Sequence, residues 1–244
     1  MGYKEIKEKY EKILKKYGIK GAIELVTGDE YQVQEIKEVD GYFTISLNMD
    51  ESEENELEDF VSYNVRQVLL PRLVLETERL VLRRVRREDA EAIFANSSDA
   101  YSCAMDSGEE PYTEMNDEFW KLVDILIQRE TQYSIALKET GEVVGTIRLR
   151  NDDTRVVEAM EVSYGIYPGY RRKGYAYEAV SALLVLLQQE LHLDLVLAGA
   201  IKENEPSISL LKKLGFQWEG MKRKGFWSAQ CGPIDLECFY RDRT

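Results

Sequence analysis

The strongest limit on the fold of this chain comes from the stretch "YPGYRRKGYAYEAV", residues 167 to 180, and from what surrounds it. A β-rich run over 156–167 leads into it, an apolar helical pattern begins at Tyr175, and a second β-rich run follows over 194–201. A strand, a helix and a strand in this order form a βαβ unit, whose two strands lie parallel in one sheet. The sequence therefore predicts an α/β fold built around this unit.

The turn within this unit places positive charge where a helix normally disfavours it. Arg171, Arg172 and Lys173 immediately precede the helical pattern. Helix N-termini carry unpaired N–H groups and a partial positive charge, so added cations are unfavourable unless an anion binds among them. Gly169 and Gly174 would let the backbone approach such an anion closely. The turn therefore predicts an anion site, most naturally one for phosphate groups.

Three common motifs do not explain the turn or its surroundings. The spacing from Gly169 to Gly174 is that of a P-loop, but Tyr175 and Ala176 stand where a nucleotide-triphosphate site needs Lys and Ser or Thr. No GxGxxG run is present for a dinucleotide fold. The stretch "YNVRQ" has the spacing of a zinc-binding HExxH motif without either histidine, and His192 is the only histidine in the sequence. We therefore expect no metal site.

The overall composition limits the partners and the compartment. The sequence has 32 Lys plus Arg against 45 Asp plus Glu, a formal net charge of −13, which disfavours nucleic acids and anionic membranes and favours a cationic partner. Cys103, Cys231 and Cys238 form no CxxC pair, which indicates free thiols in a reducing compartment. No apolar stretch is long enough to cross a bilayer. We expect a cytoplasmic protein, either a monomer or a homodimer.

The sequence pattern changes near residue 72. Residues 3–17 have apolar side chains at helical spacing, and the β-rich runs over 21–50, broken at GD and DG, predict two or three antiparallel strands. A second helix is expected to begin at Ser52 and to end at Pro71. Beyond Leu75, strands are expected at 79–86, 132–138, 142–150, 156–167, 194–201, 216–222 and 234–241. The chain is thus predicted to have a small α+β domain of unknown role over 1–72 and a larger α/β domain over 73–244.

The larger domain resembles the GNAT acyltransferases, which use acetyl-coenzyme A, over roughly residues 75 to 241. The family's signature turn is Gln or Arg, two residues, Gly, one residue, then Gly or Ala, and Arg171, Gly174 and Ala176 match it. The segments "TERLVLRRVRREDA" and "NEPSISLLKKLGF" resemble the subgroup of the ribosomal-protein N-terminal (alanine/serine) acetyltransferases. The resemblance implies a mixed, mostly antiparallel sheet whose central parallel strands splay apart.

The resemblance also implies which residues contact acetyl-CoA, the expected co-substrate. The backbone of the turn would hold the pyrophosphate, and the free strand edge at Ile166 and Tyr167 would pair with the pantetheine arm. Asn204 and Ser207, at the start of the fourth helix of the family, would contact pantetheine or substrate, with a helix cap as the alternative role of Asn204. The expected pyrophosphate residues are Arg171, Arg172, Lys173, Gly174, Tyr175 and Ala176.

Acetyl transfer to an amine requires a group that accepts the amine proton and conditions under which the coenzyme A thiolate can leave. Glu161 matches the strand position where the family often places the base, with a solvent-facing strand residue as the alternative. Glu158, three residues earlier, should point to the opposite face of that strand. Leu211 stands where many members have a tyrosine acid, so Ser207 is the expected donor unless it only packs in its helix.

The acceptor is expected to be a primary amine, on a small molecule or a protein N-terminus. Acidic residues in the connection "DSGEEPYTEMNDEFW", beginning with Asp106, favour a cationic acceptor, although a solvated acidic loop would look the same. Transfer should be direct, because no cysteine falls in the expected cleft segments. The alternative is a catalytically impaired acyl-CoA binding or regulatory module, since Leu211 replaces the usual acid and an extra domain is present.

Overall fold

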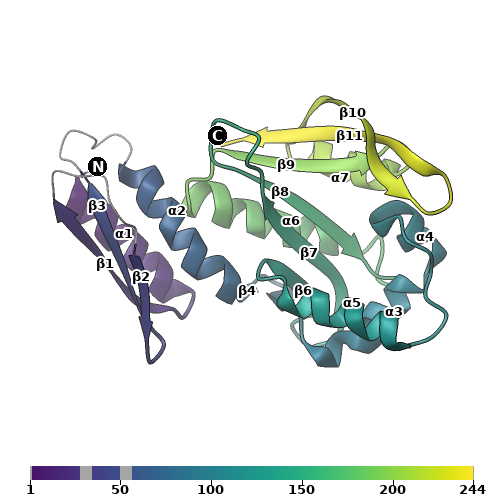
Figure 1. Ribbon diagram of the computed structural model, residues 1–244, viewed down its shortest axis with the longest axis horizontal. Helices are drawn as coiled ribbons and strands as arrows, with labels where there is room; N and C mark the ends of the chain where they lie inside the picture. Colours follow the sequence, from purple (N-terminus) through teal and green to yellow (C-terminus); the bar gives the residue numbers. More distant parts are fainter. Residues whose placement is uncertain (1, 28–34, 50–56, 244) are drawn as a thin grey trace.

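The computed structural model describes residues 2–27, 35–49 and 57–243 (Figure 1). Within these ranges the strands form a three-stranded sheet near the N-terminus, in the order β1-β3-β2, and an eight-stranded sheet, in the order β10-β11-β9-β8-β7-β6-β5-β4. None of the helices in the same ranges is long and apolar enough to cross a bilayer.

The N-terminal unit contains two helices and three strands. They are α1 (Tyr3–Lys16), β1 (Lys20–Thr27), β2 (Glu35–Val39), β3 (Tyr42–Met49) and α2 (Leu57–Leu69). The expected first helix is confirmed, and α2 gives way to a 3-10 turn over Leu70–Arg72 that contains Pro71. The GD break and the expected start of the second helix at Ser52 lie outside the described residues.

The three N-terminal strands are not all antiparallel, so that expectation was wrong. β2 and β3 form an antiparallel hairpin through Asp40 and Gly41, whose φ angles of 51° and 76° fit a tight hairpin turn. β1 pairs with the other edge of β3 and runs parallel to it. The chain reverses between β1 and β2 and again between β2 and β3, which restores its first direction. Because β3 lies between the other two strands, its pairing with β1 must be parallel.

The larger sheet has the seven strands that the sequence predicted and the short β4 at its edge, which was not predicted. They are β4 (Leu75–Glu76), β5 (Leu80–Arg84), β6 (Gln132–Leu137), β7 (Val143–Asn151), β8 (Ala159–Ile166), β9 (Leu195–Ile201), β10 (Gln217–Ser228) and β11 (Gly232–Asp242). β8 and β9 pair in parallel, and the other neighbouring strands pair antiparallel. The expected mixed sheet with a central parallel pair is confirmed.

Helices pack on both faces of this sheet. They are α3 (Ala90–Ser97), α4 (Ala100–Ser102), the π-helical turn η4 (Cys103–Ser107), α5 (Asp117–Gln128), α6 (Tyr175–Leu184), the π-helical turn η5 (Val185–Glu190) and α7 (Glu205–Lys213). α6 buries Ala179, Val180 and Leu183 in the main core, as their helical spacing predicted. Since α3 and α5 form a separate cluster around Phe119, the main core lies on the α6 side of the sheet.

α2 joins the N-terminal unit to the larger domain. In Figure 1 it lies between the small sheet and the large one, and one continuous core includes Tyr10 of α1, Val65 of α2 and Leu187 beyond α6. Tyr133 of β6 donates a hydrogen bond to the carbonyl oxygen of Leu70 (2.7 Å). The hydrophobic packing therefore crosses residue 72, and the division into domains of 1–72 and 73–244 stays a prediction.

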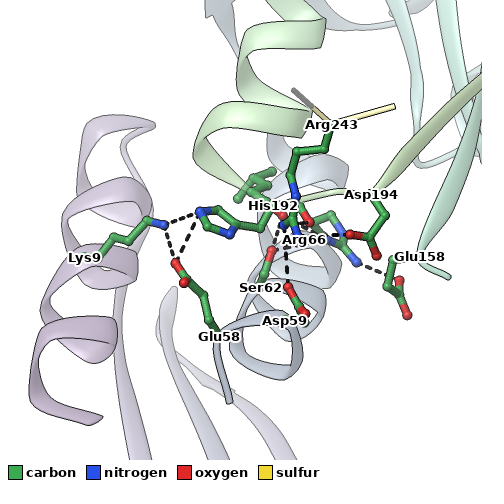
Figure 2. Close-up of polar contacts among 10 residues, drawn as sticks. Lys9, Glu58, Asp59, Ser62, Arg66, Glu158, His192, Asp194 and Arg243 are labelled. Carbon is green, nitrogen blue, oxygen red and sulfur yellow. Dashed lines mark hydrogen bonds and ion pairs between the residues drawn. The ribbon is translucent and has the colours of Figure 1, made fainter. Parts of the chain in front are cut away.

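Polar contacts reinforce this junction (Figure 2). Lys9 of α1 donates to Glu58 of α2 (2.5 Å) and to the ring of His192 (2.7 Å), which follows α6 and η5 in the chain. Arg66 of α2 is almost completely buried and donates to the carbonyl oxygen of Leu191 (2.9 Å). The two helices of the N-terminal unit thus bind the segment between α6 and β9 through charged side chains.

Candidate active site

The two parallel strands separate at the centre of the sheet. β8 and β9 pair only over Ala159–Glu161 and Leu195–Leu197. Beyond Glu161, β8 remains paired with β7, whereas the end of β9 pairs with β11. Beyond these residues, the backbone groups on the facing edges of β8 and β9 do not pair with each other. This produces the splayed opening that the resemblance implied.

The direction of the backbone in β8 distinguishes Ile166 from Tyr167. Tyr167 donates its N–H to the carbonyl oxygen of Val144 on the β7 side (2.9 Å). Successive residues of an antiparallel pair point their backbone groups to alternate sides, so Ile166 points its own toward the opening. The carbonyl oxygen of Ile166 accepts a hydrogen bond from Nε of Arg171 (3.1 Å). Of the two residues expected to pair with pantetheine, only Ile166 offers its backbone N–H to the opening.

The glycine turn ends in a row of free backbone N–H groups. Gly174 is the N-cap of α6 and has a left-handed backbone with φ of 83°, and Arg172 also has a positive φ, of 66°. Within the described part of the chain, no protein acceptor bonds the backbone N–H of any residue from Arg171 to Tyr177. Free amides at the positive end of a helix bind anions. This turn therefore has the backbone geometry of an anion site, which the sequence predicted.

Arg79 and Glu178, which the sequence analysis missed, brace the turn. Nε of Arg79 bonds Glu178 (2.6 Å), and its Nη1 donates to the carbonyl oxygen of Lys173 (3.1 Å). The same guanidinium lies over the Tyr175 ring, 4.8 Å from its centroid. Against the opposing effect of burial, hydrogen bonds from the Thr77 hydroxyl and from the backbone and side chain of Arg79 lower the pKa of the Glu178 carboxyl. A fixed ion pair thus holds the end of the turn that leads into α6.

The three cations of the turn do different things. Arg171 bonds Asp99 (2.7 Å) and Ser102 (2.6 Å) and stacks on the Tyr101 ring, so its charge is already paired. Arg172 and Lys173 are exposed. Arg171 therefore anchors the α4 segment to the end of β8, and the exposed positive charge of the turn comes from the next two residues.

Ser207 lies beside the hydroxyl of Tyr164, a residue that the sequence analysis did not identify as part of the site. The Tyr164 hydroxyl of β8 lies 3.0 Å from Oγ of Ser207, and burial raises the pKa of this tyrosine to about 12. Asn204 is the N-cap of α7 and accepts the backbone N–H of Ser207 (3.2 Å). Leu211 is fully buried in the core. The Tyr164–Ser207 pair therefore places two hydroxyls between β8 and α7, although α7 itself contains no tyrosine.

The two carboxylates considered as bases have different ion partners. Glu161 forms an ion pair with Arg150, which lies opposite it on β7 (2.5 Å), and is partly exposed. Glu158, just before β8 begins, pairs with Arg66 of α2 (2.7 Å). Glu161 thus lies on the face opposite the main core, and Glu158 lies at the junction with α2. The sequence-based choice between them favours Glu161, which is closer to the opening.

A third carboxylate, Asp106, lies on the same face as Glu161. A Cβ atom at Gly165 would lie 3.0 Å from Oδ2 of Asp106, so this carboxylate rests directly on β8. Asp106 is exposed as a whole residue, although its carboxyl end packs against β8 at Gly165. Loss of hydration at the carboxyl end, opposed by Arg171 and aided by Asp99, raises its pKa to about 6. The sequence analysis counted Asp106 only among the acidic residues of the connection that begins with it.

The aromatic and acidic residues around Asp106 are divided between core and surface. Tyr112 and Trp120 pack edge-to-face on Phe119 in the α3–α5 cluster, with ring centroids 5.7 Å and 5.6 Å away. Phe226 lies against Gly108, whereas Trp227 is 61% exposed. The acidic residues Glu109, Glu110, Glu114, Asp117 and Glu118 are exposed. The tip of the β10–β11 hairpin and η4 therefore form the wall beside Asp106.

Comparisons with known proteins agree with this geometry. A family model described as an acetyltransferase (GNAT) domain matches residues 79–217. The uncharacterized N-acetyltransferase p20 of Bacillus licheniformis is 34% identical over 68% of this chain and 93% of its own length. The ribosomal protein uS5-alanine N-acetyltransferase of Escherichia coli is 26% identical over 62% of this chain and 81% of its own.

A solved structure has the same fold. The spermidine N-acetyltransferase from Vibrio cholerae, in complex with CoA and spermine, superposes with a TM-score of 0.56 and 21% identity, covering 68% of this chain and 97% of that one. The family match spans more than half of this sequence. The chain belongs to the GNAT family and is an acetyl-CoA-dependent N-acetyltransferase.

Proposed function

We propose that the chain moves an acetyl group from acetyl-CoA directly to a primary amine on a small molecule or a protein N-terminus. The observation that carries this proposal is the opening between β8 and β9, which leads to the free amides of the turn before α6. Acetyl-CoA supplies the acetyl group as a thioester. The residues of this chain bind and orient it and move the protons.

The residues at the opening fit coenzyme A. The free N–H groups suit a pyrophosphate, and a Cβ atom at Gly174 would lie 3.4 Å from Nη2 of Arg79, which places another positive group beside these amides. Arg172 and Lys173 add positive charge, and the Ile166 amide suits a pantetheine carbonyl. The proposed coenzyme-binding residues are those predicted from sequence, Ile166, Arg172, Lys173, Gly174, Tyr175, Ala176, Asn204 and Ser207, with the Arg171 and Tyr167 side chains in supporting positions.

Direct transfer requires no covalent enzyme intermediate. Cys103 of η4, beside the proposed acceptor wall, is buried and donates to the carbonyl oxygen of Ser97 (3.3 Å). Burial raises the pKa of its thiol. A protonated, buried thiol is a poor nucleophile. The acceptor amine itself is therefore the proposed nucleophile.

The departing thiolate needs little help. A thiol with a pKa near 8.5 can leave as thiolate near neutral pH. Ser207 is the proposed donor, and Tyr164, hydrogen-bonded to it, can pass it a proton. This pair would supply the proton that a tyrosine supplies in many family members, since the buried Leu211 at that position has no hydroxyl.

Two features support an acceptor whose amine is cationic in solution. Asp106 and Glu161 lie on one face of β8, and the neighbouring wall carries exposed acidic side chains. One relative is an alanine N-acetyltransferase of ribosomal protein uS5, and a structural neighbour is a spermidine N-acetyltransferase. Both acceptor classes have amines that are protonated at neutral pH.

A thiol-release assay over a panel of amines tests the proposal. The panel contains peptides with N-terminal alanine or serine, polyamines and aminoglycosides, each supplied with acetyl-CoA. We expect release of free thiol with at least one class and a matching mass increase of the acceptor. Tight binding of acetyl-CoA without thiol release across the panel would contradict the proposal and favour a binding module.

A further inference from the structure

We infer that Asp106 is the group that accepts the proton from the acceptor ammonium, in preference to Glu161. This inference rests on the proposed function. It names the proton acceptor of that reaction and assigns Asp106 a role that its position in an acidic connection did not indicate.

The first argument is the position of the carboxylate. Oδ2 of Asp106 lies 3.0 Å from the position that a Cβ atom at residue 165 would occupy. The next residue, Ile166, turns its backbone toward the opening between β8 and β9. A carboxylate on Gly165 is therefore beside the part of β8 that the thioester end of the coenzyme should reach. The absence of a side chain at 165 is what admits it.

The second argument is the way Asp106 is held. It belongs to the π-helical turn η4, in which Gly108 donates its N–H to the carbonyl oxygen of Cys103 (2.7 Å). Gly108 has φ of 72°, and a Cβ there would overlap the carbonyl oxygen of Trp227. Ala229 in turn donates its N–H to the carbonyl oxygen of Gly108 (2.6 Å). Isolated π-helical turns are frequent at functional sites, and this one is clamped against the β10–β11 hairpin.

The third argument is that the carboxylate has no partner. In the ranges that the structure describes, no hydrogen bond or ion pair reaches Asp106, whereas Asp99 binds Arg171 (2.7 Å) and Glu161 binds Arg150 (2.5 Å). The charged or titratable groups that act on it are Arg171, Asp99, Cys103 of the same turn and, across β8, Tyr164. A carboxyl whose pKa has risen to about 6 is ionised at neutral pH and still basic enough to take a proton. Its free oxygens are available to an incoming ammonium group.

The proton balance of the step is simple. The acceptor ammonium gives one proton to the Asp106 carboxylate and becomes a neutral amine. The amine lone pair forms the C–N bond to the acetyl carbon as the C–S bond breaks and its electrons go to sulfur. The second amine proton leaves as this bond forms and neutralises the thiolate, through the Ser207 hydroxyl or through water. Asp106 then releases its proton to solvent.

The first test compares Asp106→Asn with Glu161→Gln and with Asp153→Asn, which removes the same charge from an exposed loop residue. With a peptide acceptor at pH 7, Asp106→Asn should lower turnover about a hundredfold with unchanged acetyl-CoA affinity. The wild-type rate should rise with pH through about 6, because the ionised carboxylate is the active form, and the variant should lose this dependence. Asp153→Asn should keep the wild-type rate and profile.

Turnover within threefold of wild type for Asp106→Asn, or loss of the pH dependence in Glu161→Gln instead, would overturn the inference. The second test needs no turnover. In the enzyme alone, labelled with carboxyl-13C aspartate, the resonance missing from Asp106→Asn should titrate near pH 6. Titration near the ordinary aspartate value of about 3.9 would also overturn it. If the wild type acetylates no amine, the proposed function fails, while this titration still decides the state of Asp106.

Discussion

Replacing Arg66 by alanine should destabilise the whole chain, because this buried side chain ties α2 to the larger domain. Arg66 is 3% exposed, and its guanidinium bonds Ser62 (3.1 Å), the carbonyl oxygen of Leu191 (2.9 Å) and Glu158 (2.7 Å). Truncation removes all of these bonds and leaves a gap in the junction shown in Figure 2. It also leaves Glu158 without its partner.

The magnitude follows from how well the remaining partners can be hydrated. Removing one member of a buried ion pair costs about 3–5 kcal/mol. Glu158 is 43% exposed, so water can solvate it, and Ser62 still donates to the Leu191 carbonyl oxygen. The loss should therefore lie near the lower end, about 3 kcal/mol. For a chain of this length, that corresponds to a fall in Tm of about 6 to 12 °C.

Thermal unfolding followed by circular dichroism measures the change. Arg223→Ala is the matched control, since Arg223 is 81% exposed and its pair with Asp235 should contribute less than about 1 kcal/mol. Arg66→Met, which keeps the aliphatic packing without the charge, should recover part of the loss. A Tm for Arg66→Ala within about 2 °C of wild type would refute the reasoning, because a buried, bonded guanidinium cannot be removed at so small a cost.

Three further predictions follow from the same contacts. A chain beginning at Leu73 should be far less soluble than the full chain, because loss of α2 uncovers the shared core; a soluble fragment that binds acetyl-CoA would contradict this. Tyr164→Phe should lower turnover only about tenfold, below the usual effect of a general acid, because the thiol leaves readily; kinetics at saturating acetyl-CoA measure it, and an unchanged rate would exclude Tyr164 from the reaction. Gly108→Ala should destabilise the chain by about 1–3 kcal/mol through its left-handed backbone and its overlap with Trp227, and an unchanged midpoint in urea would show that η4 is not clamped.

Local patterns were sufficient to predict most of the larger domain. The cluster of glycine and cations before Tyr175 marked a helix start, and the spacing of Ala179, Val180 and Leu183 marked its buried face, since both depend only on neighbours in the sequence. The parallel pairing of β1 with β3 was not predictable in this way. Strand patterns have a period of two whatever the direction of the partner, so they give no information about pairing.

The site was harder to predict because side-chain partners are set by contacts far apart in the sequence. The family motif identified the turn, but the pairing of Arg79 with Glu178 joins residues 99 positions apart. Arg171 matched the motif, yet its side chain binds Asp99. The unusual state of Asp106 depends on Gly165, on its missing ion partner and on its lost hydration. None of these is encoded in a local pattern.

The most direct test of the account is the affinity of acetyl-CoA for wild type and for Gly174→Glu, measured by calorimetry. The glutamate would place a carboxylate among the free amides that are proposed to hold the pyrophosphate, at a position with φ of 83°. Gly41→Glu is the matched control, with the same added charge and a similar φ of 76° in the N-terminal hairpin. We expect the wild type and Gly41→Glu to bind acetyl-CoA alike and Gly174→Glu to give no binding heat. Equal affinity for all three proteins would contradict the placement of the coenzyme at this turn.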